Sequence, residues 1–71
     1  MAKIFKSRIQ MLIDVRSHAL RNPDTADVSA YEDTANPNIC YVICLPVLAL
    51  KFDVNCEEIE LLPPTARPVE L

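Results

Sequence analysis

The sequence contains no glycine and no tryptophan, and histidine occurs once, at His18. Without glycine the chain cannot build the glycine-rich loops that cradle phosphates in P-loop and dinucleotide-binding proteins. A single histidine excludes a histidine-rich metal site and any catalysis that needs two imidazoles. These absences leave few routes to catalysis, so we expect no enzymatic activity and no cofactor.

Long uncharged apolar runs are also missing. The longest covers residues 39–50 and has Pro46 inside it, whereas a membrane-spanning helix needs about 20 apolar residues. Basic residues are spread through the first twenty positions, which breaks the apolar region that a signal peptide requires. The sequence therefore predicts neither a membrane span nor secretion.

The sequence has only three cysteines, an odd number: Cys40, Cys44 and Cys56. An odd count without a secretory signal is typical of a cytoplasmic protein with reduced thiols. On a strand, Cys40 and Cys44 would share one face roughly 13 Å apart, which is too far to hold one zinc ion. We expect buried structural cysteines and no metal.

The chain has 71 residues, of which 51% are apolar and 24% charged. That composition is globular and the length allows one small domain. A domain of this size buries only about 60% of its unfolded surface, so help from a partner is expected.

Residues 2–21 contain no proline and read as one amphipathic helix that stops at Asn22-Pro23. Polar residues would gather on one side, and apolar residues would cover about half of the circumference. The polar positions are Lys3, Lys6, Ser7, Gln10, Asp14, Ser17, His18 and Arg21. Residues 22–38 are polar and acidic, and they predict a long loop with room for a short strand or turn at residues 28–31.

Residues 39–45 predict a strand that is apolar on both faces, hence covered on both sides. Pro46 marks a break, and the alternation in residues 47–54 predicts a half-exposed strand. Residues 57–62 fit a third strand with Ile59 and Leu61 inward. A short helix capped by Asn55, with Glu58 three residues later, is the alternative.

The fold class predicted is α+β, with one N-terminal amphipathic helix packed on a two- to three-stranded antiparallel sheet. The single domain 1–71 would contain the helix (1–21), the acidic loop (22–38), the sheet (39–62) and a loosely held, proline-rich tail (63–71).

Charge is segregated along the chain. Residues 1–21 hold five basic residues and one acid, a net of +4, while residues 22–71 hold two basic residues and nine acids, a net of −7. The two parts can neutralise each other within the fold, or the resulting dipole can steer a charged partner. Arg8 and Arg16 fall inside the apolar arc of the predicted helix, where each would pair with a carboxylate, extend to water, or contact a partner.

One helix can cover only one face of a sheet. The second face must be covered by the long loop, by a second copy or by another protein. We therefore predict a protein-binding module with a protein partner or a homodimer. The predicted partner-binding residues are Asp24, Asp27, Tyr31, Glu32, Asp33, Arg8 and Arg16.

In size, acidity and lack of motifs the chain resembles the accessory proteins that phages use to block host enzymes or defence complexes. The resemblance implies evasion of host defence by an inhibitor that occludes its target and presents acidic residues to a basic groove. The alternatives are a nucleic-acid-binding regulator that uses the basic N-terminal helix, and a structural homo-oligomer subunit. The net charge of −3 makes direct nucleic-acid binding the weaker of the partner hypotheses.

Overall fold

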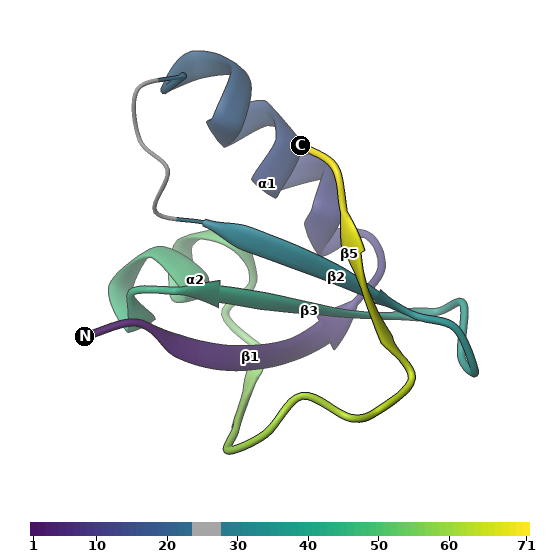
Figure 1. Ribbon diagram of the computed structural model, residues 1–71. Coiled ribbons are helices and arrows are strands. Elements are labelled where there is room, and N and C mark those ends of the chain that lie inside the picture. The colour runs from purple at the N-terminus through teal and green to yellow at the C-terminus, as the bar shows by residue number, and fades with distance from the viewer. Residues whose placement is uncertain (24–27) are drawn as a thin grey trace.

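The computed structural model describes residues 1–23 and 28–71, which form five strands and two helices. In chain order these are β1 (Lys3–Arg8), α1 (Met11–Arg21), β2 (Ser29–Asp33), β3 (Ile39–Cys44), α2 (Pro46–Phe52), β4 (Glu57–Ile59) and β5 (Ala66–Val69). The strands form one sheet in the order β4-β1-β3-β2-β5, with every neighbouring pair antiparallel (Figure 1).

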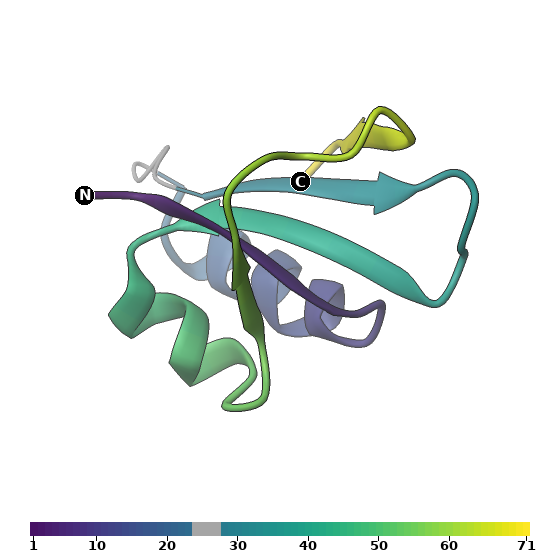
Figure 2. The same cartoon turned by 90° about the horizontal axis from the view of Figure 1, so that it is seen from below.

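The first six elements follow a β-α-β-β-α-β plan. Strands β1 and β2 both run antiparallel to β3, which is inserted between them, so this is the split β-α-β arrangement of ferredoxin-like folds, extended by β5. Both helices lie on the same face of the sheet (Figure 2). The predicted α+β class is confirmed. The prediction of one helix and two to three strands is wrong, because the described residues form two helices and five strands.

The first strand replaces the N-terminal half of the predicted helix. β1 pairs with β3 along its whole length and with β4 over Ile4–Lys6. Its side chains alternate, with Phe5 and Ser7 buried and Lys6 and Arg8 exposed. Pairing on both edges of β1 outweighs the helix propensity of these residues, because tertiary context overrides local propensity. The helix begins only at Met11, and it ends at Arg21 as the Asn22-Pro23 pair predicts.

The predicted acidic loop contains a strand. Residues 29–33 form β2, which pairs with β3 on one side and β5 on the other. The short strand anticipated near residues 28–31 is therefore present, and a loop over the whole of residues 22–38 is wrong. Asp24 and Asp27 lie outside the described residues.

β3 is the centre of the core, and the prediction of a strand covered on both sides is confirmed. Cys40, Val42 and Cys44 are fully buried on the face toward the helices, where they join the core cluster. Tyr41 points to the opposite face and is only 4% exposed.

The segment after β3 is a helix, so the predicted strand over residues 47–54 is wrong. Pro46 occupies the first turn of α2, where its missing amide and fixed φ angle suit a helix. Ala49 is buried and Leu48 packs against the core, whereas Leu50 is 52% exposed. The two-residue alternation was a coincidence of a short apolar run.

The C-terminal part of the chain closes both edges of the sheet. β4 confirms a strand at the start of the 57–62 segment and excludes the capped helix, but Leu61 is 81% exposed rather than inward. The tail is not loosely held over its length, because β5 pairs with β2 through four residues.

β4 and β5 lie on opposite edges, so the connection between them, residues 60–65, must cross the sheet. We call this segment the strap, and Figure 2 shows it on the face away from both helices. It begins near Ile4, the partner of Ile59, and ends where the backbone amide of Thr34 donates to the carbonyl of Thr65 at 2.9 Å. Tyr41, in the middle of this face, is therefore covered by the chain itself. The expectation that the loop, a second copy or another protein must cover the second face is wrong.

Candidate functional site

The seven residues predicted to bind a partner do not form one surface. Tyr31 and Asp33 alternate with Glu32 on β2, so Glu32 faces the opposite side of the sheet. Arg8 is exposed at the end of β1, and Arg16 is exposed on α1. Tyr31 and Asp33 therefore share one face of β2, whereas Arg8 and Arg16 lie on other elements. Asp24 and Asp27 are outside the described residues.

Asp33 is a hydrogen-bond acceptor that supports the fold. The Tyr41 hydroxyl donates to Asp33 Oδ2 at 2.6 Å, and the amide of Ala35 donates to Oδ1 at 2.9 Å. The bond from Tyr41 holds the pKa of Asp33 below its usual 3.8. The same bond, together with burial, raises the pKa of Tyr41 to about 12. The Asp33 carboxylate is thus occupied by the hydrogen bond from Tyr41, and no pattern in the sequence indicates this contact.

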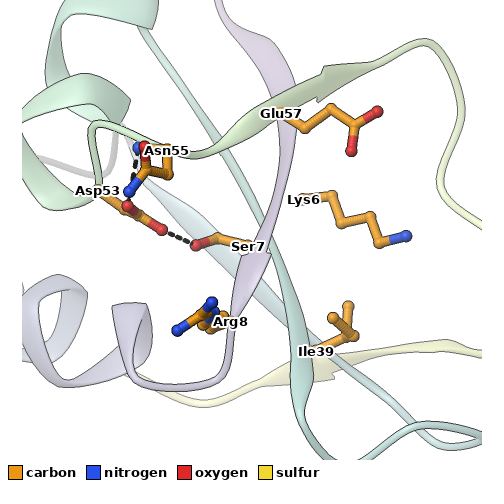
Figure 3. Close-up of a pocket in the computed structure, with 7 residues that line it drawn as sticks. All are labelled: Lys6, Ser7, Arg8, Ile39, Asp53, Asn55 and Glu57. Atoms are coloured by element: carbon orange, nitrogen blue, oxygen red, sulfur yellow. Dashed lines mark hydrogen bonds between the residues drawn. The ribbon is translucent and has the colours of Figure 1, made fainter.

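A polar hollow of about 370 Å³ lies beside β1, where β1 extends past the short β4 (Figure 3). It is lined by Lys6, Ser7, Arg8, Ile39, Asp53, Asn55 and Glu57. Figure 3 shows Ser7 directed toward Asp53, whereas Lys6 and Glu57 extend on the other side of β1. The two cations and two carboxylates give the hollow no dominant charge.

Asp53 joins the end of α2 to β1. It accepts hydrogen bonds from the Ser7 hydroxyl and from the amide of Asn55, the latter at 2.9 Å. These bonds, the one from Ser7 first, hold the pKa of Asp53 below its usual 3.8. The one histidine, His18, contacts the ring of Phe52 instead, with ring centroids 5.4 Å apart. Buried Ser7 thus has no imidazole beside it to activate its hydroxyl as a nucleophile. We call the hydrogen-bonded group of Ser7, Asp53 and Asn55 the joint, because it connects the end of α2 to β1.

The joint gives a first prediction. Asp53→Ala leaves the buried Ser7 hydroxyl and the Asn55 amide without their acceptor, and it should lower the free energy of unfolding by about 1–3 kcal/mol. The matched control, Glu60→Ala, removes an exposed carboxylate and should change stability by no more than about 0.5 kcal/mol. Urea unfolding at neutral pH measures both, and equal effects would contradict the role given to Asp53.

The joint also has a pH dependence. Because the folded-state pKa of Asp53 is lowered, its contribution is present above pH 3.8 and is lost as pH falls through the lower folded value. Asp53→Asn should therefore lose less stability than the wild type on acidification, which thermal melts above and below this pH will show.

The basic start of the chain lies beside acidic β4. Lys3 Nζ is 3.4 Å from Glu58 Oε2, and Lys6 is the register partner of Glu57. The segregated charges thus meet within the fold, although the exposed ion pair contributes only about 0–1 kcal/mol. The basic residues are divided between β1 and α1, so the continuous basic helix required by the nucleic-acid hypothesis does not exist.

The cysteines are free thiols. Cys40 and Cys44 are buried in the core, and burial raises the pKa of Cys40 to about 11. The Cys40 thiol donates to the carbonyl of Arg8 at 3.2 Å. Protonated, buried thiols are poor nucleophiles. Within residues 1–23 and 28–71, no three His, Cys, Asp or Glu side chains gather to hold a metal ion.

Exposed aliphatic side chains are concentrated on the helical layer. On α1, Ile13 is 69% and Leu20 80% exposed, with Arg16 between them at a spacing of three and four residues. These three residues, the α1 stripe, share the solvent side of the helix, because Met11, Leu12 and Val15 occupy its buried side.

A second exposed group lies on and around α2. Leu45, Val47, Leu50 and Val54, the α2 patch, are 45%, 65%, 52% and 74% exposed. The sequence signal for the α1 stripe was the apolar arc of the predicted helix, which covers about half of its circumference. The α2 patch had no such signal, because its residues were predicted to lie on strands. Arg16 fell inside the predicted apolar arc because residues 3–8, which form β1, were counted as part of the same helix.

Both edges of the sheet are poorly suited to adding a strand from another protein. β4 has three residues, two of which are glutamates. On β5, Pro68 has no amide, and the amide of Ala66 donates to the carbonyl of Pro63 at 3.0 Å. Charge, short length and proline at sheet edges oppose strand addition. Neither edge of the sheet therefore favours pairing with a strand of another protein.

No protein-family model, curated protein or solved structure matches this chain. In the described part of the chain, neither helix is long and apolar enough to cross a bilayer.

Proposed function

We propose that this chain is a non-enzymatic protein-binding module that inhibits a larger protein by occupying its surface. The observation that carries the proposal is the α1 stripe, in which two exposed aliphatic side chains bracket exposed Arg16. Arginine is one of the residues enriched among those that dominate binding energy near the centre of protein interfaces. Spacing of three and then four residues lets all three side chains enter one groove.

The partner surface is defined by this chemistry. An apolar groove about two helical turns long, with a carboxylate near its middle, would accept Ile13 and Leu20 and pair with Arg16. Occlusion of a host enzyme or defence complex, as in the phage accessory proteins that the chain resembles, needs only such a contact and no catalytic group. A cytoplasmic location is part of the same proposal.

The test compares two arginine reversals. The immobilised wild type, Arg16→Glu and Arg67→Glu are used to capture proteins from a bacterial lysate, and the captured proteins are quantified by mass spectrometry. Arg16→Glu should weaken capture of the specific partner by about tenfold or more, since arginine anchors contribute about 2 kcal/mol. Arg67 is also exposed but lies on β5, so Arg67→Glu should capture normally. Equal capture by all three proteins would contradict the use of the α1 stripe.

The hypothesis that acidic residues bind a basic groove of the partner is tested in the same assay. Its variant changes Asp24, Asp27 and Glu32 to lysine and keeps Asp33, because Asp33 accepts the Tyr41 hydrogen bond and its loss would alter the fold. If this variant no longer captures the partner while Arg16→Glu still captures it, the acidic residues bind a basic groove of the partner instead.

A further inference from the structure

We infer that the groove between α1 and α2 is a binding site for a small phosphate monoester whose phosphate is attached to an apolar or aromatic group. This interhelical groove has a volume of about 270 Å³. It is lined by Asp14, Ser17, His18, Arg21, Asn22, Leu48, Lys51 and Phe52. The residues of the α1 stripe do not line it, so the site is separate from that stripe and does not depend on the function proposed above.

Two cationic side chains reach the interhelical groove from different helices. Arg21 is the last residue of α1, and Lys51 lies in the last turn of α2. Both are exposed, and neither forms an ion pair within residues 1–23 and 28–71. Two cations without a carboxylate partner attract an anion that carries up to two negative charges.

The Ser17 hydroxyl adds a neutral donor beside Arg21. Arg21 Nη2 donates to Ser17 Oγ at 3.2 Å, and accepting this bond leaves the hydroxyl hydrogen of Ser17 available to an anion. A phosphate monoester carries about −1.5 to −2 charges at pH 7 and has three acceptor oxygens. A carboxylate has one charge and two oxygens. The guanidinium, the hydroxyl and the Lys51 ammonium therefore match a phosphate better than a carboxylate.

The position of the phosphate within the groove follows from the neighbouring negative groups. The carbonyls at the C-terminal end of a helix repel anions, but the His18 carbonyl accepts both the backbone and the side-chain amide of Asn22, each at 3.0 Å. Asp14 lies seven residues before Arg21, about 10 Å along the helix axis. It stands at the end of the groove that is shared with a neighbouring hollow lined by Asp53. The phosphate is therefore placed at the Arg21 end.

The remaining walls of the groove are apolar and receive the organic part of the ligand. Leu48 and Phe52 are half-buried and pack against the core. The His18 ring meets the Phe52 ring edge-on, with centroids 5.4 Å apart. Apolar walls with a few convergent polar groups are typical of small-molecule sites, which have volumes of about 300–1,000 Å³ for drug-sized ligands. The smaller groove suits a ligand the size of phenyl phosphate.

Titration with phenyl phosphate, followed by two-dimensional amide NMR spectra, tests the inference. The ligand should shift the signals of residues 17–22 and 48–52, with a dissociation constant of about 1 mM or lower. Inorganic phosphate and phenol should each bind at least about fivefold more weakly, because each lacks one part of the contact. A short peptide with a central phosphotyrosine should bind no more tightly than phenyl phosphate.

The variants separate a defined site from general attraction to positive charge. Arg21→Gln and Lys51→Gln should each weaken binding of phenyl phosphate by about tenfold, since each removes a charge-assisted hydrogen bond. The matched control, Arg67→Gln, removes the same charge on β5 and should bind like the wild type. The same spectra show that the variants are folded, which is expected because all three side chains are exposed.

Four results would each overturn the inference. The first is the absence of shifts in residues 17–22 and 48–52 at about ten times the expected dissociation constant. The second is phenol or inorganic phosphate binding as tightly as phenyl phosphate. The third is an equal loss of affinity in Arg67→Gln and Arg21→Gln. The fourth is tighter binding of the phosphotyrosine peptide, which would assign the groove to a phosphorylated protein instead of a small molecule.

Discussion

Replacing Phe5 with alanine is expected to destabilise the protein by about 3–5 kcal/mol, the range for truncating a buried aromatic ring. Phe5 is 4% exposed, lies opposite Val42 in the pairing of β1 with β3, and belongs to the core cluster beneath the helices. Small domains have a total stability of about 5 kcal/mol at the low end, so much of the population should unfold at 37 °C.

Urea unfolding followed by circular dichroism measures this effect, since the chain has no tryptophan for fluorescence. The control is Leu20→Ala, at a side chain that is 80% exposed, and it should shift stability by no more than about 0.5 kcal/mol. A Phe5 variant as stable as this control would contradict the placement of β1 in the middle of the sheet.

Substitution of Tyr41 is expected to give the second large loss of stability, to which its hydroxyl and its ring contribute separately. Tyr41→Phe removes the hydroxyl that donates to Asp33 at 2.6 Å and should lower stability by about 1 kcal/mol. Tyr41→Ala also removes a ring that is 4% exposed and should lower it by about 3–5 kcal/mol. If both substitutions have the same small effect, the strap does not cover the ring.

The same residue makes stability sensitive to alkali. The pKa of Tyr41 is raised from its usual 10.0 to about 12, first by the bond to Asp33 and then by burial. The protonated form is therefore favoured in the folded state, and its contribution is complete below pH 10.0 and lost as pH rises toward about 12. The melting temperature of the wild type should fall over this interval more steeply than that of Tyr41→Phe. Parallel curves would refute the assignment.

The sequence predicted those parts of the fold where local pattern and tertiary pairing agree. The doubly apolar segment is β3, and the Asn22-Pro23 pair lies where α1 ends. β1 escaped prediction because its residues also fit a helical arc, and only pairing with β3 and β4 decides between the two. α2 was misread because seven residues contain too few turns to establish a helical period, although Pro46 at its start was a usable signal.

The candidate site was predicted less well than the fold. Arg16 was singled out as a misplaced charge, and it is exposed on α1. The α2 patch was missed because its residues were assigned to a strand with a buried side. The role of Asp33 could not be inferred, since the donor is Tyr41 on another strand and no local spacing marks that pair. Contacts between strands depend on register, which a single sequence specifies weakly.

The strap and β5 together form a region that we expect to unfold locally while the core stays folded. They contain no helix, and β5 is held by β2 alone, at an edge of the sheet. Regions held by few buried contacts open at lower free energy than the core and exchange their amide hydrogens first. Hydrogen exchange should therefore divide the molecule into a slow unit, built on β3 and α1, and a faster C-terminal unit whose release uncovers the Tyr41 ring without unfolding the helices.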